Sequence, residues 1–142
     1  SQTNSGSWEG SSRRTWCNSV YKNSLPSTLL PIFKQFKTIT AQTYDGSTNQ
    51  ESIDYFALPA EKEVFDSRAY SNETEFNALF QFDWYKTTSN RFKKLGKASS
   101  AGSWWERSPN FKYSFRFCIV SSVSASTGTA NESYGLSPFG CI

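Results

Sequence analysis

The chain has 142 residues, a length that fits one compact domain able to bury well over half of its unfolded surface. Its formal net charge of +3 is spread thinly along the sequence, which argues against a nucleic-acid-binding face. It has no histidine, so the commonest general base and the commonest zinc ligand are both missing, and this weighs against an enzyme.

The amino-terminal part predicts two amphipathic helices. Residues 1–12 are rich in Ser, Gly and Asn, and within them Trp8 is expected to dock onto the domain. Ser11 or Ser12 can cap a helix that Pro26 ends, because apolar residues recur between them at helical spacing. A second short helix is predicted over residues 26–36, with its apolar residues on one side.

The middle of the chain predicts strands and a longer helix. Residues 36–43 alternate and are rich in β-branched side chains, which is typical of a strand, and residues 53–59 predict another. A short helical turn is expected over residues 60–67. A helix from Glu73 to Tyr85 would place four apolar side chains against the core, namely Phe76, Leu79, Phe80 and Trp84.

The part of the chain from Ala98 onward has no clear helical pattern and alternates in short strands. In a strand through residues 112–119, Tyr113 and Phe115 would share one face with Phe117 and Ile119. Aromatic and cationic residues crowd this stretch, a combination typical of interaction hot spots. The alternative interpretation is an ordinary core strand with its polar face in water.

Three cysteines, Cys17, Cys118 and Cys141, lack the spacing of a metal site and allow at most one internal disulfide. Cys118 and Cys141 lie in apolar settings, which predicts small buried side chains without reactive thiolates. A disulfide between these two is the alternative.

The acidic residues show no catalytic or metal-binding pattern. They are scattered at Asp54, Glu61, Glu63, Asp66 and Glu106, and a glycosidase pair among them stays open. The sequence contains no EF-hand loop and none of the short calcium-binding motifs of sugar-binding C-type lectins. We therefore expect no cofactor, no metal and no calcium-dependent sugar binding.

Hydropathy predicts a soluble segment. No stretch approaches the roughly 20 apolar residues of a membrane span, and the polar start shows no signal peptide. We expect no membrane insertion.

Several motifs, in a fixed order, carry a resemblance to a known family. The motifs that carry the resemblance are, in order, SGSWEGSSRRTW, FALPAEKEVFDSRAYS, GSWWERSPN, FRFCIVSS and SYGLSPFGCI. Through them the chain resembles a bacterial and prophage domain of unknown function common in gut Firmicutes. The resemblance spans nearly the whole chain. It implies an α+β, C-type-lectin-like fold with two amphipathic helices, a small twisted antiparallel sheet and a loop-rich carboxyl-terminal half. It also implies that relatives carry a further amino-terminal stretch.

Some members of that family are the variable proteins of diversity-generating retroelements, which rewrite codons near the carboxyl end. The resemblance thus implies a single ligand-binding domain over residues 1–142 with a variable region at residues 104–142. Its framework would be Trp104, Trp105, Arg107, Ser108, Pro109, Phe117, Cys118, Val120, Ala125, Gly135, Pro138, Cys141 and Ile142, and of these Trp104, Trp105, Phe117 and Cys118 are expected to be buried. Its exposed, ligand-binding positions would be Asn110, Phe111, Lys112, Tyr113, Phe115, Arg116, Ile119, Ser121, Ser122, Ser126, Thr127, Thr129, Asn131, Glu132 and Tyr134.

One departure from the family pattern concerns Glu106, which stands where the family usually has Leu. A second is the ending FGCI, where the family more often shows Gly-Phe-Cys-Ile. With these departures two alternatives stay open: an actively diversified target or a fixed relative of one.

The function that the resemblance implies is non-enzymatic receptor binding or adhesion, on a phage tail in the virion or on a bacterial cell surface. The partner would be a protein or glycan receptor, with no nucleic acid, and self-association into a homo-oligomer stays open. Two alternatives remain: an enzyme related to formylglycine-generating proteins, and a purely structural virion subunit.

Overall fold

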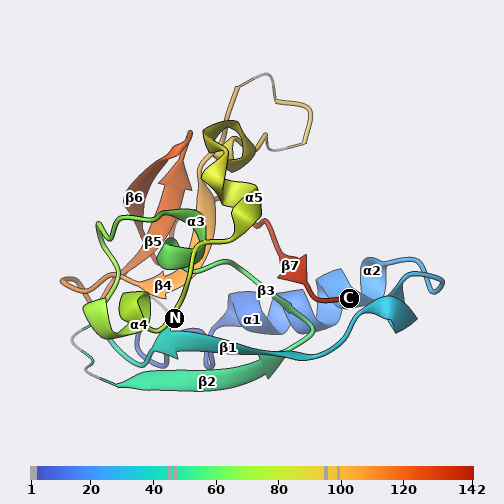
Figure 1. Ribbon diagram of the computed structural model, residues 1–142, viewed down its shortest axis with the longest axis horizontal. Coiled ribbons are helices and arrows are strands. Elements are labelled where there is room, and N and C mark those ends of the chain that lie inside the picture. The colour runs from blue at the N-terminus through green and yellow to red at the C-terminus, as the bar shows by residue number, and fades with distance from the viewer. Residues whose placement is uncertain (1–2, 45, 47, 95, 99) are drawn as a thin grey trace.

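A computed structural model of the chain describes residues 3–44, 46, 48–94, 96–98 and 100–142. Short helices pack against three small antiparallel sheets, with strand orders β1-β2, β3-β7 and β4-β5-β6 (Figure 1). The predicted mixed class with small antiparallel sheets is confirmed. Within the described ranges, no helix is both long and apolar enough to cross a membrane.

The predicted amino-terminal helix is confirmed. α1 (Ser12–Trp16), the π-helix η1 (Cys17–Tyr21) and α2 (Lys22–Ser24) follow one another without a gap. The Ser11 hydroxyl accepts a hydrogen bond from the Arg14 amide at 3.0 Å, which caps the start. Leu25 is extended, as expected for a residue that precedes a proline.

The second predicted helix is wrong in extent. Only a 3-10 turn, η2 (Leu30–Ile32), forms within residues 26–36, and Phe33 after it is extended. Pro31 lies in the middle of the predicted segment, where its ring and missing amide prevent helical hydrogen bonds to the residues before it.

Two strands form a hairpin that runs along the bottom of Figure 1. β1 (Phe36–Ala41) pairs with β2 (Asn49–Asp54), in a register from Phe36 opposite Asp54 to Ala41 opposite Asn49. The first strand is confirmed. The strand predicted over residues 53–59 is instead divided between the end of β2 and β3 (Phe56–Ala57), which pairs with β7 (Phe139–Gly140).

The helical turn predicted after Pro59 is confirmed as α3 (Glu61–Val64), but the long helix after it is wrong. The chain forms α4 (Glu73–Asn77), α5 (Asp83–Lys86) and the 3-10 turn η3 (Thr88–Arg91). Between α4 and α5 the backbone packs along α3, where the Phe82 amide donates to the Glu63 carbonyl at 2.9 Å. This tertiary contact overrides the helical pattern.

The break between α4 and α5 changes which side chains are buried. Phe76 is buried as predicted, and Tyr85 joins it in the interior. Phe80 and Trp84, which the helical pattern placed against the core, are 74% and 63% exposed.

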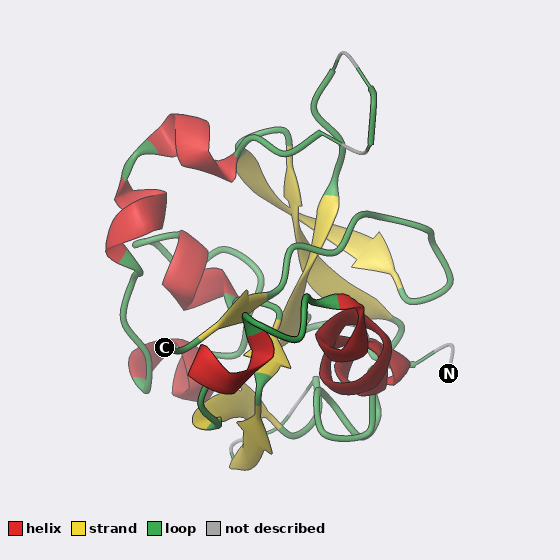
Figure 2. Cartoon of the chain, turned by 90° about the vertical axis from the view of Figure 1, so that its right-hand side faces the viewer, coloured by secondary structure: helices red, strands yellow, loops and turns green. Residues whose placement is uncertain are grey.

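The central sheet separates two apolar cores. β4 (Trp104–Pro109), β5 (Arg116–Ser121) and β6 (Ser124–Thr129) are joined as antiparallel neighbours. Trp105, Phe117 and Ile119 pack with Trp8 and Cys17, whereas Trp104 and Val120 pack with Val64, Phe65 and Tyr85. Figure 2 shows α3, α4 and α5 on one side of these strands and the amino-terminal helix, nearly end-on, on the other.

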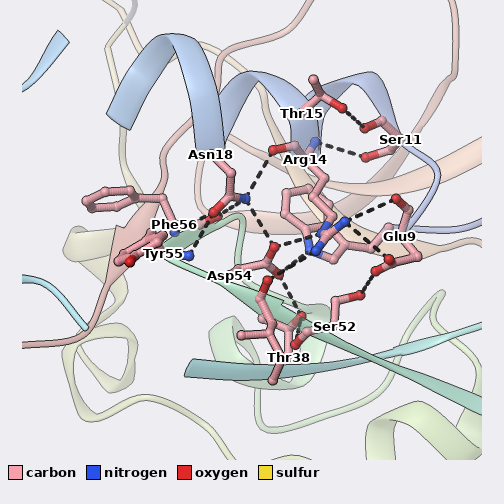
Figure 3. A network of polar contacts seen from close by, with 12 residues as sticks. Glu9, Ser11, Arg14, Thr15, Asn18, Thr38, Ser52, Asp54, Tyr55 and Phe56 are labelled. Carbon is pink, nitrogen blue, oxygen red and sulfur yellow. Dashed lines mark hydrogen bonds and ion pairs between the residues drawn. The ribbon is translucent and has the colours of Figure 1, made fainter. Parts of the chain in front are cut away.

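A buried carboxylate joins the amino-terminal helix to the hairpin (Figure 3). Asp54 accepts hydrogen bonds from Trp8 Nε1 at 2.8 Å and Arg14 Nε at 2.7 Å. Asn18 Nδ2, at 3.1 Å, and Thr38 Oγ1, at 2.9 Å, also donate to it. The predicted docking of Trp8 is thereby confirmed.

The three cysteines are all free. Cys118 is buried as predicted, and Cys17 is also buried. Cys141 is exposed, so its predicted burial is wrong, because it lies at the chain end in an isolated bridge with Lys34. No disulfide joins Cys118 to Cys141.

Candidate functional site

The loop between β4 and β5, residues 110–115, presents three aromatic rings to solvent. Phe111 is 43% exposed, Tyr113 42% and Phe115 44%. The Tyr113 and Phe115 ring centroids are 5.6 Å apart. The strand predicted over residues 112–119 is wrong in its first half, since β5 begins only at Arg116.

Three cations lie among these rings. Lys112 Nζ is 5.5 Å from the centroid of the Tyr113 ring, and Arg116 Cζ is 5.8 Å from that of Phe115. On the other flank, Arg68 Cζ is 5.5 Å from the Phe111 centroid. None of the three forms an ion pair with a described residue. We call Phe111, Lys112, Tyr113, Phe115 and Arg116 the loop surface.

The loop backbone is held from within by Asn110. This buried side chain uses its Oδ1 to accept hydrogen bonds from the backbone amides of Lys112 and Tyr113, both at 2.9 Å. Such an Asx turn fixes the chain reversal through one buried side chain and two backbone amides, and uses none of the side chains of residues 111–115. The side chains that follow are therefore free to point outward.

The amino-terminal segment holds the other side of the loop. Buried Asn4 donates from Nδ2 to the carbonyls of Tyr113, at 3.1 Å, and Arg116, at 2.8 Å. Its backbone amide donates to the Ser114 carbonyl at 2.5 Å. Three hydrogen bonds from one residue thus fix the loop over a sequence separation of more than 100 residues.

A buried glutamate holds the segment of residues 69–71, which contacts the third side of the loop. The Glu61 carboxylate accepts the backbone amides of Ala69, Tyr70 and Ser71 at 3.0, 2.8 and 2.6 Å. The Tyr70 carbonyl in turn accepts the Phe111 amide at 2.9 Å. The position of Phe111 is therefore fixed by a chain of contacts that begins in the core.

The segment after β6 completes this end of the sheet. The Ala130 amide donates to the Phe115 carbonyl at 2.8 Å, and Glu132 accepts the Thr129 amide at 2.7 Å. Hydrogen bonds from the Tyr134 hydroxyl and the Thr129 amide lower the pKa of the Glu132 carboxyl. Thr129, Asn131 and Glu132 therefore lie beside the loop surface.

The predicted ligand-binding positions fall into three groups. The first group gathers at one end of the sheet and consists of Phe111, Lys112, Tyr113, Phe115, Arg116, Thr129, Asn131, Glu132 and Tyr134. The centroid of the Tyr134 ring lies 5.0 Å from that of Trp105. Ser121, the last residue of β5, and Ser122, in the β5–β6 turn, lie at the opposite end. Ser126 and Thr127 lie half-buried along β6 between the two ends.

Two of the predicted ligand-binding positions are buried, so their predicted exposure is wrong. Asn110 is buried because its side chain organises the turn, and Ile119 is buried because alternation along β5 points it into the core beside Trp105 and Phe117. The predicted burial of Trp104, Trp105, Phe117 and Cys118 is confirmed. Ile142, predicted as framework, is exposed at the chain end.

Acidic groups gather in the interior behind the loop. Arg107 forms a two-pronged ion pair with Glu63, with N–O distances of 2.5 and 2.8 Å, and this neutralises one carboxylate. Burial raises the pKa of Glu75 to about 7, although Ser108 and the Ala41 amide donate hydrogen bonds to it.

Glu106 is the least satisfied group of this interior. It is fully buried, and neither of its carboxyl oxygens has a hydrogen-bond partner among the described residues. Burial, reinforced by Glu61 and Glu75, raises its pKa well above the ordinary value. The described residues contain no group of three or more His, Cys, Asp or Glu that could hold a metal ion.

Asn4, Glu61 and Arg68 are the contributors to the site that sequence reasoning missed. The Asn110 turn could have been predicted from the preference of Asn for turns. Asn4 and Glu61 act through partners distant in sequence, and no local sequence pattern predicts such contacts.

Comparison with known proteins places the chain in a family. No curated protein and no solved structure matches it significantly. A family profile does match, and it covers residues 1–142, the whole chain. The protein therefore belongs to the family described as a domain of unknown function (DUF6273).

Proposed function

We propose that the protein is a non-enzymatic binding domain that holds its ligand on the loop surface. The observation that carries the proposal is the contrast between exposed side chains and a fixed backbone. Phe111, Tyr113 and Phe115 are each more than 40% exposed. The backbone that carries them is fixed by hydrogen bonds from buried Asn4 and Asn110.

This arrangement favours binding for two physical reasons. Aromatic rings supply large contact area at a low cost in side-chain entropy, and they are enriched among the residues that dominate binding energies. A loop already held in place loses little further freedom when a ligand docks.

The chemistry of the loop surface suits a protein or a glycan receptor. Rings pack against apolar side chains and sugar faces, and Lys112 and Arg116 add directional donors and positive charge. The family resemblance supports a C-type-lectin-like classification and display on a phage tail or bacterial surface. The loop side chains contribute little to the core, so this scaffold could accept many sequences there.

The test uses a loop variant, Tyr113→Ala/Phe115→Ala/Arg116→Ala, and a matched control, Phe80→Ala/Trp84→Ala/Lys86→Ala. The control also removes two exposed rings and one cation, but from α5 and the segment before it. Binders to the wild type are first selected from a random peptide display library and from a glycan array.

We expect the selected binders to lose about tenfold or more in affinity for the loop variant and to bind the control like the wild type. Both variants should keep the wild-type melting temperature within a few degrees. A loop variant that retains full binding, or that loses binding only because it unfolds, contradicts the proposal.

A further inference from the structure

A separate pocket lies between the amino-terminal segment and the end of β6. Its volume is about 300 Å³, and its wall includes Ser5, Ser11, Ser12, Arg13 and Asn131. The pocket is thus lined largely by hydroxyl groups with one guanidinium. It includes no residue of the loop surface.

Arg13 is held in a fixed orientation in this pocket. Its Cζ lies 3.8 Å from the centroid of the Trp105 ring and 5.3 Å from that of Phe117. One Nη donates to the Ala130 carbonyl at 3.3 Å. Stacking on an indole and one hydrogen bond together fix the plane of the guanidinium.

The charge of Arg13 has no partner among the described residues. The neighbouring Arg14 provides the contrast, since it pairs with Glu9 and Asp54. Burial without a compensating carboxylate lowers the pKa of Arg13 to about 10. A desolvated cation gains most from an anion that enters its site.

We propose that this pocket binds the carboxylate of a small hydroxylated acid, of the size and chemistry of a uronic acid. A planar guanidinium matches a carboxylate through two parallel hydrogen bonds. The serine hydroxyls provide donors and acceptors for the hydroxyl groups of the ligand. The volume of about 300 Å³ lies at the lower end of ligand pockets, as a single sugar ring requires.

The inference goes beyond the proposed function and does not depend on it. The loop surface offers rings to a macromolecule, whereas this pocket offers one fixed cation among hydroxyls to a small acid. The two sites can therefore fail separately: the pocket is tested with a small acid and the loop surface with selected peptides and glycans.

The test measures binding of glucuronate by calorimetry and by the fluorescence of the tryptophans, with glucose as the uncharged match, at constant ionic strength. Arg13→Met keeps an unbranched apolar side chain over Trp105 but removes the charge and the donors. Lys34→Met is the matched control, because Lys34 is an exposed cation outside the pocket.

We expect saturable binding of glucuronate but not of glucose, at least about tenfold weaker binding by Arg13→Met, and unchanged binding by Lys34→Met. Should Arg13→Met unfold, Asn131→Trp blocks the pocket from its exposed rim and should weaken binding equally. The proposal is overturned if glucuronate does not bind, if glucose binds equally well, or if the pocket variants bind like the wild type.

Discussion

Trp8 and Asp54, 46 residues apart in sequence, are joined by a buried hydrogen bond of 2.8 Å from the indole nitrogen to the carboxylate. Three further donors, from Arg14, Asn18 and Thr38, meet on the same carboxylate. The amino-terminal segment, the first helix and the hairpin therefore depend on one buried negative charge.

Asp54→Ala should lower the free energy of unfolding by about 3–5 kcal/mol, because it leaves the buried donors without their charged acceptor. Urea unfolding checks this. The control is Glu51→Ala, which removes the exposed pair with Lys37 and should change stability by less than about 1 kcal/mol. Equal effects of the two substitutions would rule out the central role of Asp54.

Glu106→Leu should stabilise the protein. A buried carboxyl without hydrogen-bond partners costs about 1–3 kcal/mol even when it is protonated, and Leu fills a similar volume. The gain should be larger at pH 8 than at pH 4.5. This follows because a glutamate with a raised folded-state pKa destabilises the fold as pH rises from its unfolded value of 4.5.

The same relation predicts the pH dependence of the wild type. Glu75 remains protonated in the folded state up to about pH 7 but ionises in the unfolded chain from about pH 4.5, so it reduces stability as pH rises through that interval. Urea unfolding at a series of pH values checks the pH dependence of the wild type and that of the Glu106→Leu gain, with exposed Glu73→Gln as the control.

If the stability gain from Glu106→Leu did not grow with pH, this would contradict a raised pKa for the Glu106 carboxyl in the folded state.

Gly128→Ala should destabilise the protein through steric overlap of side chains, since the backbone φ of Gly128 is not positive. A β-carbon there would overlap the Tyr134 ring and lie 3.2 Å from the Trp105 ring. We expect a loss of about 1–3 kcal/mol, together with a change in tryptophan fluorescence as Tyr134 moves off Trp105. Ser126→Ala on the same strand should leave both signals near their wild-type values.

The cysteines should differ sharply in reactivity. Burial raises the pKa of Cys17 to about 12 and raises the pKa of Cys118 well above its ordinary value, whereas Cys141 is exposed. A thiol reagent should therefore label one cysteine in the native protein and all three after denaturation. Rapid native labelling that persists in Cys141→Ser would show that a second thiol is accessible.

Sequence reasoning succeeded where the signal was local. The serine cap predicted at Ser11 or Ser12, the stop at Pro26 and the alternation of β1 all depend on neighbouring residues, and each is confirmed, the cap at Ser11. The helix predicted over residues 73–85 failed because packing against α3 outweighed local preference.

For the candidate site, too, local features could be predicted from the sequence and long-range contacts could not. The richness in rings and cations between β4 and β5 is visible in the sequence, and the exposure of Tyr113 and Phe115 follows from the turn at Asn110. Asn4 could not be predicted, since its partners lie 109 and 112 residues away. That Glu106 would lack a hydrogen-bond partner could not be predicted either, because this depends on how distant segments pack around it.

The contact of Asn4 with the loop also sets an order of events during synthesis. Asn4 leaves the ribosome more than 100 residues before Tyr113 and Arg116, whose carbonyls accept its hydrogen bonds. At elongation rates of about 5–20 residues per second, the early segment waits on the order of 5–20 seconds for these partners. The loop surface therefore acquires its shape late, once most of the domain has been translated.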